Sequence, residues 1–298
     1  MSNAAGLVWK WADETPDAVA LREGERSRTF SQLRFEIGGA MAKLAHLGVE
    51  PGDRVLIVVP TSEEFVLAYH AVLALGATAV TVNPLCTQRE LLHFVEDAGC
   101  TCVLGWHESR GPVEAIANTC GLPLWLLEPG CVTAAQERPA LADVSTEDAA
   151  VLLYTSGTTG SPKGAVLTHG NLLACGAAFA DALEVTNADR MGTALPLFHV
   201  FGQAAVMFTV YTPGGSMSLL RPFDAAFAAA HGSRSEAHRS RRSPDDVERH
   251  APRRHRRHRR GSEQPAVGLL RRRRSAFQGR PGFPRPLRRD GPRRLRVE

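Results

Sequence analysis

Strand-like apolar runs alternate with helix-like segments along residues 1–224, and this alternation leaves few folds open. Apolar residues recur at helical spacing from Ser31 to Leu47, and the buried run RVLIVVP follows. Strands separated by helices of about 10 to 17 residues pair in parallel, because each connection must return to the same end of the sheet. We therefore expect an α/β fold with a doubly wound, mostly parallel sheet and helices on both of its faces.

Capping signals mark where these helices begin and end. Gly48 and Gly76 follow apolar helical patterns and are expected to end their helices. Ser62 is a candidate N-cap, and Thr87 with Glu90 has the spacing of a capping box that opens a helix to about residue 98. Asn171 is interpreted as the N-cap of a later helix. These signals agree with the alternating pattern.

Charge divides the chain into two parts. Residues 1–230 hold 13 basic and 24 acidic side chains, whereas residues 231–298 hold 22 arginines, no lysine and 7 acidic side chains. The later part shows no helical or strand period and has few large apolar residues to offset chain entropy, which predicts disorder. The predicted organisation is a partial domain over residues 1–224 and an Arg/Pro-rich tail over residues 225–298.

Three interpretations of the tail remain open. It could be an arm that binds nucleic acid, since dense arginines neutralise phosphates and release counterions. It could be a solvated extension without a role. A frame-shifted translation is favoured, because GC-rich DNA read out of frame yields arginine and proline but almost no lysine, and the change falls in mid-domain.

Several classes of protein are disfavoured by the remaining composition. The N-terminus lacks the basic start and apolar run of a secretory signal, and no segment approaches the roughly 18 to 20 apolar residues that span a bilayer. The six cysteines are scattered without paired zinc-ligand spacing, so reduced thiols are expected. A cytoplasmic protein without a transmembrane segment or metal site is predicted.

The stretch YTSGTTGSPKGAVLTHGN begins at Tyr154, where the buried run AAVLLYT ends. Glycines permit tight turns and close approach of a bulky anion, while hydroxyls and backbone N–H groups can form an anion-binding concavity. Lys163, one of only three lysines, adds a positive charge. The predicted phosphate-binding residues are Thr155, Ser156, Gly157, Thr158, Thr159, Gly160 and Lys163.

The stretch is not a Walker A loop. That motif needs Gly before its Lys and a hydroxyl residue after it, whereas Pro162 precedes Lys163 and Gly164 follows. Pro162 also disfavours an immediate helix. From composition alone, a glycine- and threonine-rich surface loop between strands stays the alternative.

The whole string closely resembles the phosphate-loop signature of the adenylate-forming enzymes, with residues 155–164 matching over ten consecutive positions. ALPLFHVFGQ, residues 194–203, is similar to the next core block of that family in its fatty acyl-CoA ligase form. The order of the segments that precede these motifs also fits the family: TPDAVAL, then TFSQL, then the segment from Gly48 to Pro84. The resemblance runs from near residue 8 to Asp224.

The resemblance implies a two-step acid–thiol ligase. A fatty acid attacks the α-phosphorus of ATP to give acyl-AMP and pyrophosphate, and coenzyme A then displaces AMP; Mg²⁺ accompanies the phosphates. Ser156, Thr158, Thr159 and Lys163 would contact the β- and γ-phosphates, with Thr155, Gly157 and Gly160 shaping the turn. His199 would lie at the acyl pocket, although a histidine among apolar neighbours is otherwise more often a packing residue. His70 and His169 are interpreted as structural.

The chain departs from the family pattern after Asp224. No GYG triplet occurs in the sequence, so the GYGxTE motif is missing, and the family's C-terminal catalytic lysine has no counterpart; the catalytic residues therefore stay unassigned. The chain is expected to hold about half of the large domain. An inactive fragment that keeps only the phosphate loop is the main alternative, and nucleic-acid binding through the tail is a weaker one.

Overall fold

Strands and helices alternate in the computed structural model, which describes residues 1–155, 162–193 and 195–220. The strands are β1 (Val19–Glu23), β2 (Arg26–Thr29), β3 (Arg54–Val58), β4 (Thr78–Thr81), β5 (Cys102–Trp106), β6 (Leu124–Leu127), β7 (Ala149–Thr155), β8 (Lys163–Thr168), β9 (Arg190–Thr193) and β10 (Ser216–Leu219). The helices are α1 (Gly6–Glu14), α2 (Phe30–His46), α3 (Glu63–Ala74), α4 (Gln88–Ala98), α5 (Arg110–Cys120), α6 (His169–Ala182) and α7 (Thr209–Tyr211), with 3₁₀-helical η1 (His107–Ser109) and π-helical η2 (Phe201–Phe208).

Two predictions concern parts of the chain beyond these ranges. The boundary after residue 224 and the disorder of the tail lie outside the described residues and stay predictions. Within the described residues, no helix combines the length and apolar character needed to cross a bilayer. All six cysteines are free thiols, as expected.

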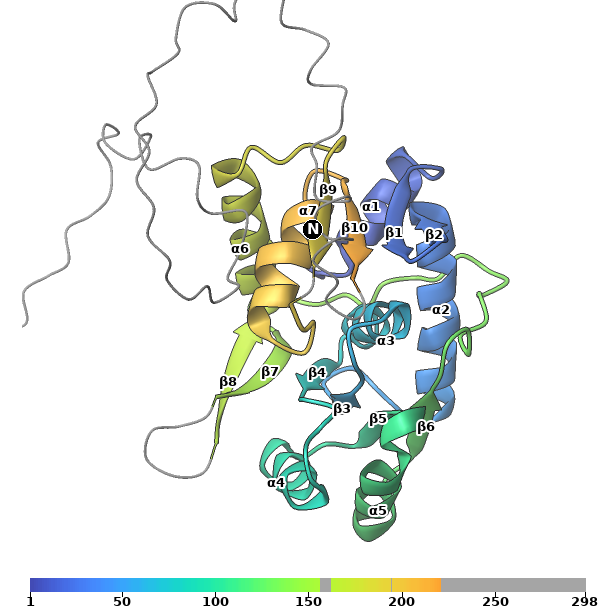
Figure 1. Cartoon of the computed structure of the whole chain (residues 1–298), viewed down its shortest axis with the longest axis vertical. Helices are drawn as coiled ribbons and strands as arrows, with labels where there is room; N and C mark the ends of the chain where they lie inside the picture. The colour runs from blue at the N-terminus through green and yellow to red at the C-terminus, as the bar shows by residue number, and fades with distance from the viewer. Residues whose placement is uncertain (156–161, 194, 221–298) are drawn as a thin grey trace, which may run out of the picture. The chain divides into compact units, whose positions relative to one another are not determined.

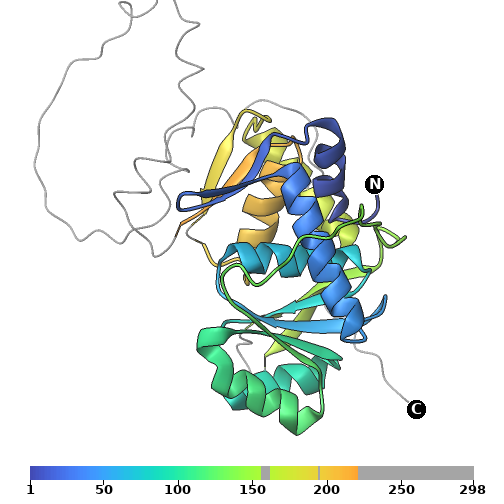
Figure 2. The same ribbon diagram turned by 90° about the vertical axis from the view of Figure 1, so that its right-hand side faces the viewer.

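The larger sheet has six strands in the order β6-β5-β3-β4-β7-β8. The five strands from β6 to β7 pair in parallel, and β8 adds to β7 in the antiparallel sense. The layering is visible in Figure 2: α4 and α5 lie below the sheet, and α3 with α2 lies above it. The predicted α/β class, a mostly parallel sheet with helices on both faces, is confirmed.

Side-chain alternation along β3 shows why both faces must be covered. Val55 and Ile57 join the apolar cluster that contains α2 and α3, whereas Leu56 and Val58 join the cluster that contains α4 and α5. Successive residues of a strand point to opposite faces, so a strand made only of apolar residues requires a helical layer on each side. The run RVLIVVP therefore belongs in the middle of the sheet, where it lies.

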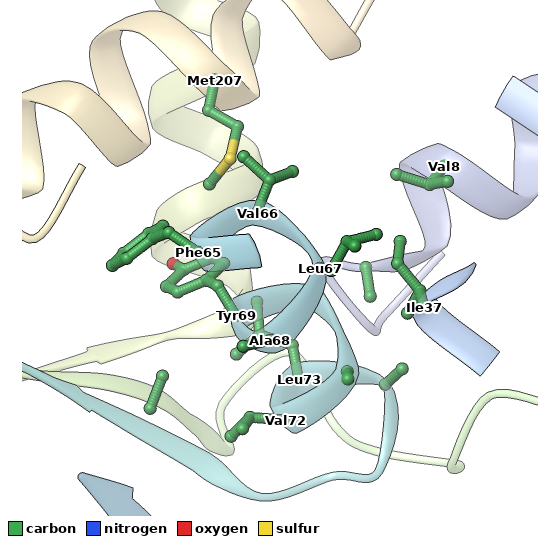
Figure 3. Close-up of a cluster of buried hydrophobic side chains, with 14 of the residues drawn as sticks. Val8, Ile37, Phe65, Val66, Leu67, Ala68, Tyr69, Val72, Leu73 and Met207 are labelled. Atoms are coloured by element: carbon green, nitrogen blue, oxygen red, sulfur yellow. The ribbon is translucent and has the colours of Figure 1, made fainter. Parts of the chain in front are cut away.

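Helix α3 is buried along its whole length, because each of its residues from Glu63 to Ala74 is buried. Figure 3 shows Val8 and Ile37 near Leu67 on one side of this helix and Met207 near Val66 on another. A helix that is apolar all round belongs in a protein interior rather than at its surface. Helix α3 thus joins α1, α2 and η2 into one core.

A second sheet, in the order β2-β1-β10-β9, was not anticipated by the sequence analysis, which expected a single sheet. Strand β1 pairs in parallel with β10, so segments about 200 residues apart lie side by side. These strands have only four or five residues each. Such short runs carry too weak a period to be recognised without their partners.

Most of the predicted helix ends are confirmed. The Ser62 side chain accepts a hydrogen bond from the Phe65 N–H at 3.2 Å, and Thr87 with Glu90 forms a complete capping box. Gly48 and Gly76 have φ values of +85° and +75°, which glycine adopts without the steric cost of a Cβ.

The interpretation of Asn171 as an N-cap is wrong. Strand β8 runs to Thr168, whose extended backbone makes it the cap of α6, and Asn171 occupies the third helical position. The Asn171 side chain accepts a hydrogen bond from the Thr168 N–H at 3.1 Å, completing a capping box. The Thr-x-x-Asn spacing from Thr168 to Asn171 therefore indicates the start of this helix.

Close packing of α6 on η2 depends on Gly176. A Cβ at this position would lie 2.8 Å from backbone atoms of Phe208, so we expect Gly176→Ala to lower the free energy of unfolding by about 1–3 kcal/mol. Gly111 in α5 is the matched control, because a Cβ there meets nothing within 4 Å and alanine favours a helix. Urea unfolding measures both variants. A Gly176→Ala chain as stable as the Gly111→Ala chain would contradict this packing.

Burial of His70 predicts a pH dependence of stability. Its Nδ1 lies 2.8 Å from the Val66 carbonyl oxygen, and burial lowers the pKa of His70 from 6.5 to about 4. The unfolded chain therefore binds the extra proton first, and the stability contributed by neutral His70 is lost as pH falls from about 6.5 to about 4. Comparison with His70→Phe at each pH isolates this contribution, expected to total about 3 kcal/mol. A difference that stays constant over this range would refute it.

Candidate active site at the carboxyl edge of the larger sheet

The β7–β8 hairpin brings the two ends of the predicted phosphate loop together. Thr155 lies opposite Lys163 in the antiparallel register, and the Thr155 Oγ1 donates to the Lys163 carbonyl oxygen at 3.4 Å. Lys163 opens strand β8 rather than a helix, as Pro162 indicates. The loop therefore begins and ends on hydrogen-bonded strands at one edge of the sheet.

Of the predicted phosphate-binding residues, two are described. Thr155 and Lys163 are both exposed, and Lys163 forms no ion pair with any described residue. The predicted contacts at Ser156, Gly157, Thr158, Thr159 and Gly160 lie outside the described residues. The Lys163 ammonium is thus available to an anionic ligand at the base of the loop.

The second motif, residues 195–203 as described, is hydrogen-bonded to the ends of two central strands. The Thr81 hydroxyl at the end of β4 donates to the Phe198 carbonyl oxygen at 3.0 Å. The Leu197 N–H donates to the Thr61 hydroxyl, just beyond β3, at 3.0 Å. Strands β3, β4 and β7 are parallel, so their carboxyl ends, the hairpin loop and this motif share one edge.

Gln203 holds this arrangement from inside the core. Its buried side-chain amide donates to the Thr81 hydroxyl at 3.0 Å and to the Leu197 carbonyl oxygen at 2.9 Å, and it accepts from the Tyr69 hydroxyl at 3.1 Å. Gln203 was not predicted from the sequence as a functional residue. The available signal was one amide in the otherwise apolar run FGQAAVMF, since a buried polar side chain must find partners.

His199 lies on the exposed side of the same motif. Its ring centroid is 4.6 Å from that of Phe198, and its backbone carbonyl accepts from the Gln203 N–H at 3.3 Å. The next residues, Val200 and Phe201, are 45% and 49% exposed, and the π-helix η2 begins at Phe201. Single-turn π-helical features are often found at functional sites. The predicted pocket residue therefore stands beside exposed apolar side chains at the carboxyl edge.

The two histidines interpreted as structural, His70 and His169, have the surroundings expected of such residues. His70 is buried in α3, and His169 is buried at the start of α6. The Ala4 N–H donates to the His169 Nδ1 at 3.1 Å, and burial lowers the pKa of His169. Neither side chain reaches solvent at the sheet edge.

Residues 8–235 match the family of AMP-binding enzymes. The chain belongs to this family. The match includes the hairpin and the 195–203 motif, so the resemblance that the sequence analysis identified is confirmed. It extends over both sheets of the described chain.

Relatives of this AMP-binding enzyme chain include acid–CoA ligases. This chain is 30% identical over 216 residues to a 2-succinylbenzoate–CoA ligase from Bacillus cereus. The match covers 72% of this chain and 42% of the relative. This chain is 31% identical over 210 residues to a feruloyl-CoA synthase from Amycolatopsis sp., covering 70% and 42%. The chain thus spans less than half the length of these curated relatives.

Solved structures give the same assignment. ATP-bound MatB from Rhodopseudomonas palustris superposes with a TM-score of 0.71 at 28% identity, covering 77% of this chain and 48% of that protein. The fold is therefore that of the N-terminal region of adenylate-forming enzymes.

The Gln203 network can be tested through stability. Gln203→Leu leaves the buried Tyr69 hydroxyl and the Leu197 carbonyl without these partners, so we expect a loss of about 1–3 kcal/mol in the free energy of unfolding. Tyr69→Phe removes one partner only and should cost less. In the double variant the losses should be less than additive, because both changes break the same hydrogen bond. Strict additivity in urea unfolding would contradict the network.

Proposed function

We propose that this chain is the N-terminal, phosphate-binding part of an acid–thiol ligase that activates a carboxylic acid with ATP and transfers it to coenzyme A. The observation that carries the proposal is the convergence of two motifs at one sheet edge. The hairpin supplies Lys163 at the base of the loop, and the 195–203 motif is anchored beside it on β3 and β4. ATP and coenzyme A are substrates in this proposal, which the names of the relatives support.

The residues of this chain would act mainly through charge and position. Pyrophosphate leaves with high negative charge, so donors fixed in advance around the β- and γ-phosphates stabilise charge that develops during transfer. Lys163 would supply one positive charge there. Thr155 would help to hold the turn, and Ser156, Thr158 and Thr159, with Gly157 and Gly160, are proposed to complete the contacts.

Mg²⁺ is proposed to arrive with ATP rather than to occupy a site built by the protein. Within the described part of the chain, no three histidine, cysteine, aspartate or glutamate side chains are grouped to hold a metal ion. Hydroxyl and phosphate oxygens are ligands that Mg²⁺ accepts while keeping several waters. Bound in this way, the ion would neutralise phosphate charge.

The acid substrate is proposed to carry an apolar group. His199 is the proposed residue at the acyl pocket, and its neighbours Val200 and Phe201 expose apolar surface. The sequence of this motif favours a fatty acid. The ligase from Bacillus cereus and the synthase from Amycolatopsis sp. are named for aromatic acids, so an aryl acid is the second candidate, and pyrophosphate release with each class of acid would distinguish them.

Lys163→Ala tests the phosphate contact. Removing the ammonium deletes a charge-assisted hydrogen bond, so we expect the affinity for MgATP to fall about tenfold or more. Lys43→Ala is the matched control, because this lysine is also exposed but lies in α2, away from both motifs. Isothermal titration calorimetry measures both variants. Equal dissociation constants for Lys163→Ala and the unaltered chain would count against the phosphate-loop assignment.

Nucleotide binding without turnover is the alternative function. It is favoured because the GYGxTE motif does not occur within these 298 residues. Assays of pyrophosphate release separate the two proposals: acid-dependent release supports the ligase, whereas MgATP binding with no release supports the alternative. Nucleic-acid binding through the tail stays a prediction outside the described residues.

A further inference from the structure

The base of the phosphate loop, formed by Thr155 and Lys163, lies beyond the point where β7 stops pairing with β4. Strand β4 pairs with β7 only as far as Leu153, whereas β8 pairs with β7 through Thr155. Tyr154 and Thr155 therefore have a strand neighbour on one side only. Figure 1 shows the β7–β8 hairpin reaching out past the other strands of the sheet. A two-stranded ribbon by itself is marginally stable in water, so side-chain contacts decide how firmly this end is held.

Tyr154 makes such contacts with helix α4. Its ring centroid lies 4.4 Å from that of Phe94, and its hydroxyl donates to the Asp97 Oδ2 at 2.7 Å. Phe94 and Asp97 are three residues apart and so lie on the same face of α4. Phe94 is 7% exposed, which fixes one wall of the contact in the core, while Asp97 lies at the surface.

The hydrogen bond from Tyr154 to Asp97 is of the stronger kind. A hydroxyl that donates to an ionised carboxylate forms a charge-assisted bond, and 2.7 Å is a short separation. Burial, then the hydrogen bond to Asp97 and its charge, raises the pKa of Tyr154 above its ordinary value. The hydroxyl therefore stays protonated, and remains a donor, at any pH at which the protein would be assayed.

We propose that the Tyr154–Asp97 pair is a tether that positions the base of the phosphate loop and thereby sets the ATP affinity of the site. The tether joins α4 to the residue immediately before Thr155, so its loss would let the hairpin end move relative to the 195–203 motif. Tyr154 and Asp97 are positioning residues, because they act through the loop. The effect on ATP rests on the proposed function, whereas the mechanical effect on the hairpin does not.

Digestion of the full chain with endoproteinase Lys-C tests the mechanical effect. The chain has three lysines; Lys10 and Lys43 lie within α1 and α2, and Lys163 lies at the loop base. Tyr154→Phe keeps the ring and removes the hydroxyl. We expect it, like Asp97→Ala, to raise the rate of cleavage after Lys163 about three- to tenfold over the unaltered chain. Cleavage at Lys10 and Lys43 serves as the internal control for global unfolding.

Asp97→Asn separates the tether from a general loss of stability. Its side-chain carbonyl can still accept from Tyr154 but without the charge, so cleavage after Lys163 should be clearly slower than in Asp97→Ala, between that rate and the rate of the unaltered chain. Unchanged cleavage in Tyr154→Phe, or Asp97→Asn behaving like Asp97→Ala, would overturn the proposal. Acceleration at Lys10 and Lys43 in parallel with Lys163 would also overturn it, because the effect would then be global.

Calorimetry on the same variants tests the effect on ATP. The MgATP affinity of Tyr154→Phe and Asp97→Ala should fall about three- to tenfold, with Asp97→Asn between Asp97→Ala and the unaltered chain. Unchanged affinity in Tyr154→Phe would overturn the claim that the tether sets affinity. If the unaltered chain binds no MgATP, the proposed function fails, and the digestion alone then decides whether the tether holds the hairpin.

Discussion

Parallel pairing of β3, β4 and β7 determines where the two motifs meet. Parallel strands need long crossovers that return the chain to the starting end, so every carboxyl end opens on the same edge. The loop that begins at Thr155 and the turn that follows Thr81 therefore converge although more than 70 residues separate them. Apolar residues on both faces of β3 require helices on both sides, which leaves that edge for a ligand.

Buried polar side chains fix the positions of the segments at the carboxyl edge of the larger sheet, because each of these side chains must keep its hydrogen-bond partners. Gln203 is buried, and a buried amide destabilises the folded state unless its donors and its acceptor are hydrogen-bonded. Its partners come from α3, β4 and the 195–198 turn, so the second motif occupies one position relative to the sheet. Tyr154 is proposed to do the same for the hairpin from the side of α4. In both cases one hydrogen-bonded side chain, Gln203 or Tyr154, holds a segment that lies beyond the backbone pairing of the central strands.

The sequence was most informative where local signals and burial agree. Helices α2, α3 and α4 were predictable from apolar spacing and from caps such as Ser62 and the Thr87 box.

Helix α5 was missed, because it begins without a side-chain cap and carries Gly and Pro in its first turn. Strand β8 was missed because its first four residues are exposed and show no alternation. The amide in the apolar run FGQAAVMF signals a buried polar residue, but the partners of Gln203 were not predictable, because they lie far apart in the chain. The phosphate loop was predicted from its residues, the second motif was found through its resemblance to the adenylate-forming enzymes, and their shared edge followed only from the sheet order.

We propose that the hairpin and the 195–203 motif form one nucleotide-binding edge. Hydrogen exchange measured by mass spectrometry with and without MgATP tests it most directly, because bound phosphates and the ordering of both segments should slow exchange of their amides. We predict slower exchange in peptides covering residues 154–164 and 195–203 together, with no change in α5. Slower exchange in neither segment, or only in peptides remote from this edge, would contradict the account.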